Sequence, residues 1–220
     1  TRNLSGLIEA ADLKEFWSDA AAAYRVAIKH LAAAGCTYLQ LDAVSFSYLC
    51  DPKILSNFRA NGDDPNTLAL DYANAINGAL ADRPAGMTVT MHTCRGNFRS
   101  TWFAGGAYQD SVIDAMFSAN VDAFFMEYDS DRAGTFEPLR YLPKTKKVVL
   151  GLVTSKSGTL ESKDDLKGRI DAAAKFVPLE NLCLSPQCGF SSTHHGNLLT
   201  VDEQWRKLER VVEVAREVWG

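Results

Sequence analysis

The sequence lacks the features of a nucleic-acid-binding or membrane-spanning protein. It contains no block of basic residues, and 23 Lys and Arg against 27 Asp and Glu give a formal net charge of −4 over 220 residues. This balance predicts no electrostatic site for nucleic acid or an anionic membrane. The longest apolar run, Val148 to Val153, is far shorter than the roughly 20 residues that cross a bilayer. We therefore expect a small-molecule partner.

Features of a secreted protein are also missing. The first ten residues, TRNLSGLIEA, contain no basic segment that leads into an apolar one, so no signal peptide is expected. The expected compartment is the cytoplasm, where the five cysteines, an odd number, should be free thiols, metal ligands or nucleophiles. With 46% hydrophobic and 23% charged residues, no Gly/Ser linker and no repeat, residues 1–220 are expected to form a single domain.

Apolar spacing and turn residues predict strands and helices that alternate along the chain. Expected strands are 37–42, 87–91, 123–126, 148–153 and 181–185; expected helices are 11–34, 66–83, 110–119, 136–142, 162–176 and one that begins after Thr200. This alternation predicts an α/β fold with a parallel sheet and right-handed crossovers. A doubly wound sheet and part of a (β/α)₈ barrel both fit the pattern.

The final helix has a capping box, Thr200 to Glu203, and an amphipathic pattern. Its expected apolar face is Trp205, Leu208, Val212, Ala215 and Trp219. Its expected polar face is Lys207, Arg210, Glu213 and Glu217.

Each expected strand is followed by a side chain that can bind a metal or move a proton. Reactive groups of parallel α/β folds collect at these carboxyl ends. Asp42 ends the first strand, and Lys156 follows the fourth. The ends of the second, third and fifth strands supply His92, Cys94, Glu127 and Cys188. Together these residues offer one imidazole, one carboxylate and two thiolates, a set of ligands that zinc accepts. A buried histidine with buried core cysteines is the alternative reading of these residues.

The ligand types indicate which chemistry this zinc site would support. Their charges sum to about −3, so a bound Zn²⁺ site would carry about −1 and polarise carbonyl groups poorly. An added thiolate would stay nucleophilic on such a metal. The set therefore favours sulfur alkylation over hydrolysis.

At these positions the chain resembles the carboxyl-terminal catalytic barrel of the cobalamin-independent methionine synthase family, including its short single-barrel relatives. The resemblance is carried by LQLDAVSFSYLCDP, MHTCRGNFRS, VDAFFMEYDSDRAGTFEPL, VVLGLVTSKSG and LSPQCGF, and runs from about Thr37 to Trp219. It implies a TIM (β/α)₈ barrel of which about the last five βα units are present. A missing segment or another copy of the chain is expected to complete the barrel.

The resemblance also implies the reaction and the roles of residues. The family's zinc ligands correspond to His92, Cys94, Glu127 and Cys188, and Asp42 corresponds to the partner of the substrate ammonium group. The implied cofactor is Zn²⁺, the thiol substrate homocysteine and the methyl donor a methyltetrahydrofolate. Zinc would lower the pKa of the thiol, which then takes the N5-methyl group.

One loop departs from the family pattern. The methionine synthases place a histidine after the strand that corresponds to 148–153, whereas this chain reads Thr154-Ser155-Lys156-Ser157. Lys156 could protonate the leaving amine only if burial lowers its pKa, and a solvated loop lysine is the alternative.

Other functions stay open because of this departure and because the first strands of the barrel are expected to be missing. They are alkyl transfer to another thiol from a corrinoid or epoxide donor, a non-catalytic barrel fragment with structural zinc, and a porphyrinogen-decarboxylase-like activity, against which the zinc ligands argue.

Several neighbouring residues have both a functional and a structural reading. Arg95, Asn97 and Trp102 could contact an anionic substrate or the donor, but Arg95 could equally pair with Asp129 or Asp131, and Trp102 could anchor its loop. Cys36 and Cys183 are expected in the core and Cys50 close to the site and prone to oxidation. His194 and His195 are expected in a solvated loop.

Overall fold

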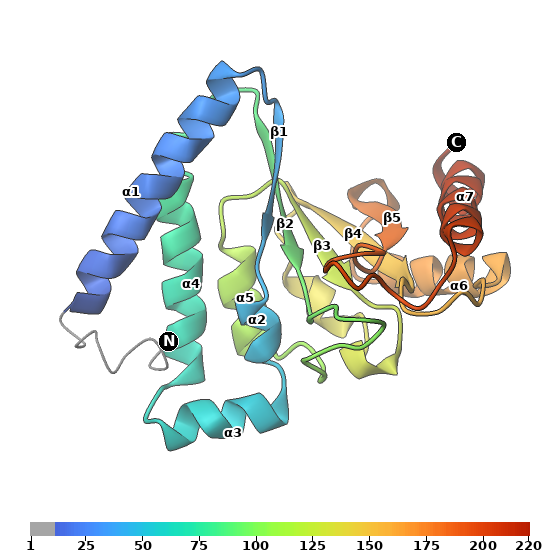
Figure 1. The fold of residues 1–220 in the computed structure, drawn as a ribbon, viewed down its shortest axis with the longest axis horizontal. Coiled ribbons are helices and arrows are strands. Elements are labelled where there is room, and N and C mark those ends of the chain that lie inside the picture. Colours follow the sequence, from blue (N-terminus) through green and yellow to red (C-terminus); the bar gives the residue numbers. More distant parts are fainter. Residues whose placement is uncertain (1–11) are drawn as a thin grey trace.

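Five parallel strands alternate with helices in the computed structural model, which describes residues 12–220 (Figure 1). The strands are β1 (Tyr38–Asp42), β2 (Thr88–Thr93), β3 (Ala123–Glu127), β4 (Lys147–Val153) and β5 (Leu182–Pro186). The α-helices are α1 (Asp12–Ala33), α2 (Ser45–Tyr48), α3 (Pro52–Ala60), α4 (Pro65–Ala79), α5 (Asp110–Phe117), α6 (Lys163–Ala174) and α7 (Val201–Trp219). Short 3₁₀ helices are η1 (Asp131–Ala133), η2 (Glu137–Tyr141) and η3 (Leu179–Asn181).

These elements confirm the expected alternation of strands and helices. Every predicted strand is present within two residues of its expected bounds, and the expected helix at 136–142 is the 3₁₀ helix η2. The start of the first helix, expected at residue 11, and the residues examined for a signal peptide lie outside the described residues.

The order of the strands distinguishes the two architectures that the sequence left open. The sheet runs β1-β2-β3-β4-β5 in chain order, and every neighbouring pair is parallel. A doubly wound sheet reverses its order at a switch point, whereas a (β/α)₈ barrel adds each strand beside the previous one. The sheet is therefore the wall of a partial barrel, and within residues 12–220 its edges are β1 and β5.

The two faces of the sheet differ because side chains alternate along a strand. One face is apolar and packs into the core with the helices, through residues such as Val89, Met91, Phe124, Met126, Val148 and Leu150. The other face carries His92 and Glu127 at its carboxyl end. Figure 1 shows α1 beside α4 at one end of the sheet and α6 with α7 at the other.

Two helices in the loop after β1 were not predicted. Asp51 caps α3 by accepting hydrogen bonds from the backbone N–H groups of Lys53 and Ile54, and Pro52 begins the helix. The pair Asp51-Pro52 repeats the Asp64-Pro65 signal that predicts α4. The four residues of α2 are too few to show a helical period.

The expected faces of α7 are partly wrong. The capping box at Thr200 is present, but Trp205 is 63% exposed and Lys207 is 0% exposed. The Lys207 ammonium group donates to both carboxylate oxygens of Glu161 over 3.0 Å and to Thr159 O over 2.6 Å. This ion pair turns the helix so that a charged residue faces the protein. Neither α7 nor any other helix within residues 12–220 has the length and apolarity to cross a membrane.

Candidate metal centre

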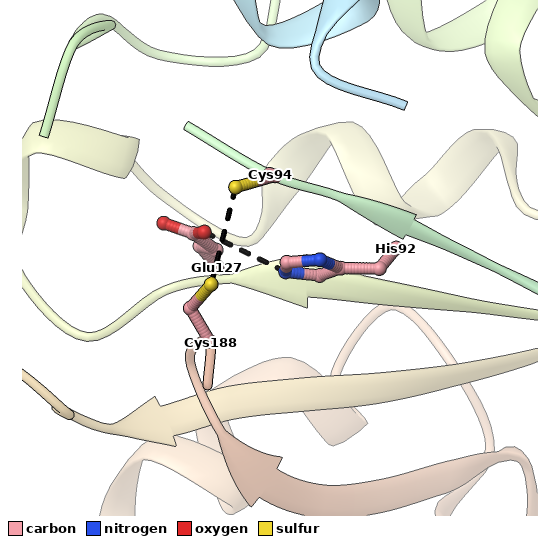
Figure 2. A group of neighbouring side chains, drawn as sticks. All are labelled: His92, Cys94, Glu127 and Cys188. Carbon is pink, nitrogen blue, oxygen red and sulfur yellow. Dashed lines mark hydrogen bonds and ion pairs between the residues drawn. The ribbon is translucent and has the colours of Figure 1, made fainter. Parts of the chain in front are cut away.

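Four side chains from three strand ends converge at the carboxyl edge of the sheet (Figure 2). One nitrogen, one oxygen and two sulfur atoms all lie within 4.8 Å of one another, and they belong to His92, Cys94, Glu127 and Cys188. His92 lies in β2, Cys94 follows that strand, Glu127 ends β3, and Cys188 follows β5. The structure therefore brings together the whole set that the sequence singled out.

Strand register explains how the set is assembled. His92 pairs with Phe125 across β2 and β3, so Glu127, two residues further on, lies on the same face. Next to it, Gly151 of β4 pairs with Glu127. A Cβ atom at Gly151 would come within 2.8 Å of the Cα of Gln187, so the missing side chain lets the segment that carries Cys188 approach.

The geometry and donor types fit zinc. The two Sγ atoms are 3.9 Å apart, and two sulfurs bound to one tetrahedral zinc at ~2.3 Å would be about 3.8 Å apart. Thiolate and imidazole groups bind zinc well, whereas calcium and magnesium prefer oxygen ligands. The residues present therefore match a four-ligand zinc site without a large rearrangement.

The two thiols of the cluster share one hydrogen bond. The hydrogen bond from Cys94 lowers the pKa of Cys188 to about 6, and the positive charge of His92 adds to this effect against the opposing effect of burial. The same bond raises the pKa of Cys94, and burial raises it further. Cys188 is thus the thiol of the pair that ionises more readily, and it lies where a soft cation would bind.

His92 is held between two carboxylates. Its Nδ1 lies 3.0 Å from Asp42 Oδ1, and its Nε2 lies 3.5 Å from Glu127 Oε1 and 3.1 Å from the carbonyl oxygen of Gln187. Burial alone would lower the pKa of His92, but the hydrogen bonds to Asp42 and Glu127 raise it to about 10. Asp42 therefore orients the ring so that Nε2 faces the cluster, as carboxylates do for metal-binding histidines.

Asp42 also keeps an exposed side. Its side chain is 65% exposed, and Oδ1 is the oxygen that contacts His92. No hydrogen bond to its second oxygen, Oδ2, is found within the described residues. Such a position suits a carboxylate that binds an ammonium group of a substrate.

Lys156 is tied to the loop after β2 by two hydrogen bonds. Its Nζ donates to Asn97 Oδ1 over 3.0 Å and to the carbonyl oxygen of Thr101 over 2.8 Å. Burial lowers the pKa of Lys156, and the nearby charges of Glu127 and Cys188 oppose this effect. Lys156 is therefore half-buried and hydrogen-bonded rather than freely solvated, and its role as an acid stays a prediction.

Asn97 joins the loops that follow three strands. Its amide nitrogen donates to Gly189 O over 2.7 Å and to Ser192 Oγ over 2.8 Å, while its oxygen accepts from Lys156 and Asn197. The side chain is buried, and its bonds within the protein leave little capacity for a substrate.

Arg95 and Trp102 lie in different surroundings. Arg95 is 0% exposed, with its guanidinium 4.4 Å from the centre of the Tyr108 ring and a hydrogen bond to Gly106 O, so it presents no surface to a substrate anion. The proposed pairing of Arg95 with Asp129 is wrong, because Asp129 pairs with Arg132. Trp102 is half exposed and lies over the Arg132 guanidinium.

Two residues beside the cluster were not singled out from the sequence. Arg132 donates to Glu127 Oε2 over 3.0 Å, and it comes from η1, directly after β3. Tyr48 of α2 packs on Phe103, and burial together with the charge of Cys94 raises its pKa. Both residues lie in segments that carry the family resemblance, which was the available signal.

The remaining cysteines and histidines lie outside the cluster. Cys50 is buried, and burial raises its pKa, so the expectation that it is prone to oxidation is wrong. Cys36 and Cys183 are half-buried rather than in the core. His194 and His195 are exposed in a loop, as expected.

Comparison with known proteins identifies the family. The model of the cobalamin-independent synthase catalytic domain matches residues 3–217. The expectation that the similarity begins at about Thr37 is therefore wrong, because the match begins some thirty residues earlier.

Individual relatives agree with this match. YxjH of Bacillus subtilis, a protein of uncharacterised function, is 52% identical over 212 residues, which cover 94% of this chain and 55% of YxjH. A solved structure from Listeria monocytogenes, provisionally named a vitamin-B12-independent methionine synthase, is 40% identical with a TM-score of 0.74 and covers 96% of this chain and 57% of that one.

A more distant structure shares the fold. It is a B12-independent methionine synthase from Shewanella sp. W3-18-1 in complex with selenomethionine, with 19% identity and a TM-score of 0.65 over 89% of this chain and 52% of that one. This chain spans about half the length of the curated relatives it matches. Since the catalytic-domain model matches residues 3–217, the chain belongs to the cobalamin-independent synthase family.

Proposed function

We propose that this protein is a zinc-dependent S-methyltransferase that moves a methyl group from a methyltetrahydrofolate-type donor to the thiol of homocysteine. The observation that carries the proposal is the convergence of one imidazole, one carboxylate and two thiols within 4.8 Å. Membership of the cobalamin-independent synthase family supports the same reaction. Zinc bound to this set would supply a site that keeps a substrate thiol deprotonated and nucleophilic at neutral pH.

The residues around the cluster suit a small amino-acid thiol. The exposed carboxylate of Asp42 would bind the substrate ammonium group while its other oxygen orients His92. An ammonium group held beside the cluster would direct the thiol of homocysteine toward the metal ligands. Asp42 would then serve both the metal and the substrate.

Lys156 is the proposed proton donor. Methyl transfer from the N5 of a folate leaves an amine anion, which must be protonated as the bond breaks. Two of the three N–H bonds of Lys156 are used by Asn97 and Thr101, and the third has no partner within residues 12–220. Burial lowers the pKa of Lys156, which makes its proton easier to transfer than that of a solvated lysine.

The test is a product assay on the zinc-loaded protein. Homocysteine is offered with methyltetrahydrofolate, with a methylcorrinoid or with a small epoxide, and the alkylated thiol is identified by mass spectrometry. Methionine formed from the folate supports the proposal. Transfer only from the corrinoid or the epoxide would show that the methyl donor is not a folate. A protein that holds zinc but neither binds nor alkylates a thiol would show that the metal is structural.

A further inference from the structure

The two oxygens of the Glu127 carboxylate have different partners. Oε1 accepts the backbone N–H of Arg95 over 3.1 Å and lies 3.5 Å from His92 Nε2, so it belongs to the cluster. Oε2 accepts the Nη2–H of Arg132 over 3.0 Å. Because Glu127 is completely buried, neither oxygen can be satisfied by bulk water. Arg132 therefore determines which oxygen faces the other ligands.

The Arg132 guanidinium is fixed in place from several sides. Its Nη2 also donates to Asp129 Oδ1 over 2.6 Å, and its Nε donates to Ser130 Oγ over 3.1 Å. The ring of Trp102 covers its face, with 5.0 Å between Cζ and the ring centre. The side chain is only 8% exposed. A planar group with these partners can turn little, so it holds Oε2 in one direction.

We propose that Arg132 is a positioning residue that holds Glu127 as a one-oxygen metal ligand. The inference rests on the proposed zinc site. A free carboxylate can bind a cation through one oxygen or both, and the second oxygen would take space that the substrate thiol needs. With Oε2 bound to Arg132, only Oε1 is available to the cation. Trp102 supports this arrangement from the loop after β2 because it packs on the guanidinium.

The chain provides a matched control for this arginine. Arg140 also contacts two carboxylates, Asp110 and Glu137, at 2.6 and 3.2 Å. It lies over an aromatic ring as well, 4.5 Å from the centre of Tyr141. It contacts none of the four cluster residues. Arg132 and Arg140 thus share their type of contact and differ in their relation to the cluster.

The experiment measures metal binding rather than catalysis. Zinc affinity is determined by competition with a chromophoric chelator, and the visible absorption of the cobalt-substituted protein reports the number and type of ligands. Arg132→Met is expected to weaken zinc binding by roughly 10- to 100-fold and to change the cobalt bands. Arg132→Lys, which keeps one charged donor, should recover part of the zinc affinity and part of the cobalt spectrum. Arg140→Met should leave the zinc affinity and the cobalt spectrum unchanged.

Each result has a separate meaning. If Arg132→Met melts at a lower temperature but keeps the zinc affinity and cobalt bands of the wild type, Arg132 is only structural and the inference is overturned. If Arg132→Met does not fold, Arg132→Gln decides, because it also removes the charge, and a wild-type affinity and spectrum in that variant overturn the inference. A wild-type protein that binds no zinc overturns the proposed function and this inference with it.

Discussion

The Sγ atoms of Cys94 and Cys188 lie 3.9 Å apart, although the two cysteines are 94 positions apart in the sequence. The fold alone brings them together, one after β2 and the other after β5. Two thiols at this distance in a buried cluster with a histidine and a carboxylate form a preorganised site, so metal binding should need little reordering of the chain.

Replacing either cysteine should remove the metal. We expect about one zinc ion per chain in protein purified without chelators, and its loss in Cys188→Ser, because a serine hydroxyl is not deprotonated at neutral pH as a thiol ligand is. Zinc content is measured by mass spectrometry of the metal after gel filtration. Cys36→Ser is the control, since its hydroxyl can keep the bond to Tyr38 O. Equal zinc content in Cys188→Ser and the wild type would contradict the assignment.

Gly151 should be required for the shape of the site. A Cβ atom there would come within 2.8 Å of Gln187 Cα and 2.9 Å of Met126 O, both backbone atoms that cannot turn away. Gly151→Ala is expected to lower the free energy of unfolding by roughly 1 to 3 kcal/mol through overpacking, and to weaken zinc binding by moving Cys188. Urea unfolding and chelator competition measure the two effects.

The matched control is Gly168→Ala in α6. A Cβ atom at Gly168 meets nothing within 4 Å, so alanine should raise the free energy of unfolding by roughly 0.5 to 1 kcal/mol. The prediction for Gly151 fails if both alanine variants stabilise the protein or if Gly151→Ala keeps full zinc affinity.

Asp122 should make stability depend on pH. Burial would raise its pKa, but two hydrogen bonds from Arg83 at 2.9 Å and one from the backbone N–H of Val89 at 2.7 Å hold it below the ordinary 3.8. A folded-state pKa below the unfolded one gives stabilisation that is complete above the unfolded pKa and is lost as the pH falls through the folded pKa. The stabilisation by Asp122 is therefore lost below about pH 4.

The variant Asp122→Asn tests this prediction. The side chain of Asp122 is 42% exposed, so solvent screening limits the expected loss at pH 7 to roughly 1 kcal/mol. In urea unfolding, the difference from wild type should be constant from pH 7 to 5 and shrink toward pH 3. Asp82→Asn, which breaks only an exposed contact of 4.0 Å with Arg25, should show almost no difference at any pH. If the difference in free energy of unfolding between wild type and Asp122→Asn grows as the pH falls, the predicted direction of the pH dependence is wrong.

The sequence predicts the strands and the cluster for a physical reason. Strands have a period of two and end at loops, and parallel α/β folds gather reactive groups at one edge. His92 and Glu127 could therefore be assigned to one site before their distance was known. The barrel order could not be derived from periodicity, because it depends on which strands pair.

Long charged side chains were the hardest to predict. Lys207 lies on the expected solvent face of α7, and its burial is made favourable by Glu161 and the carbonyl oxygen of Thr159, 46 and 48 positions away. Arg132 is similar, because its role depends on a carboxylate and an aromatic ring from two other segments. Helical or strand period contains no information about such partners, so Lys207 is assigned to the solvent face and Arg132 is given no role.

Lys156 should control the alkaline side of the activity profile. Burial lowers its pKa below the ordinary 10.5. A general acid works while it is protonated, so methyl transfer should fall as the pH rises through this lowered pKa. Lys156→Arg keeps the charge but holds its proton too tightly to transfer it, and should lower the rate of methyl transfer by about 10²- to 10⁴-fold and remove the alkaline fall.

Single-turnover rates from pH 6 to 10 measure this effect, with zinc content checked in each variant so that metal loss is not mistaken for loss of the acid. Lys175→Gln is the control, because Lys175 is exposed at the end of α6. If Lys156→Arg keeps the wild-type rate and the wild-type alkaline fall, the proton comes from another group. Lys156 would then only tie the loop after β4 to Asn97, and its loss should affect stability without changing the shape of the pH profile.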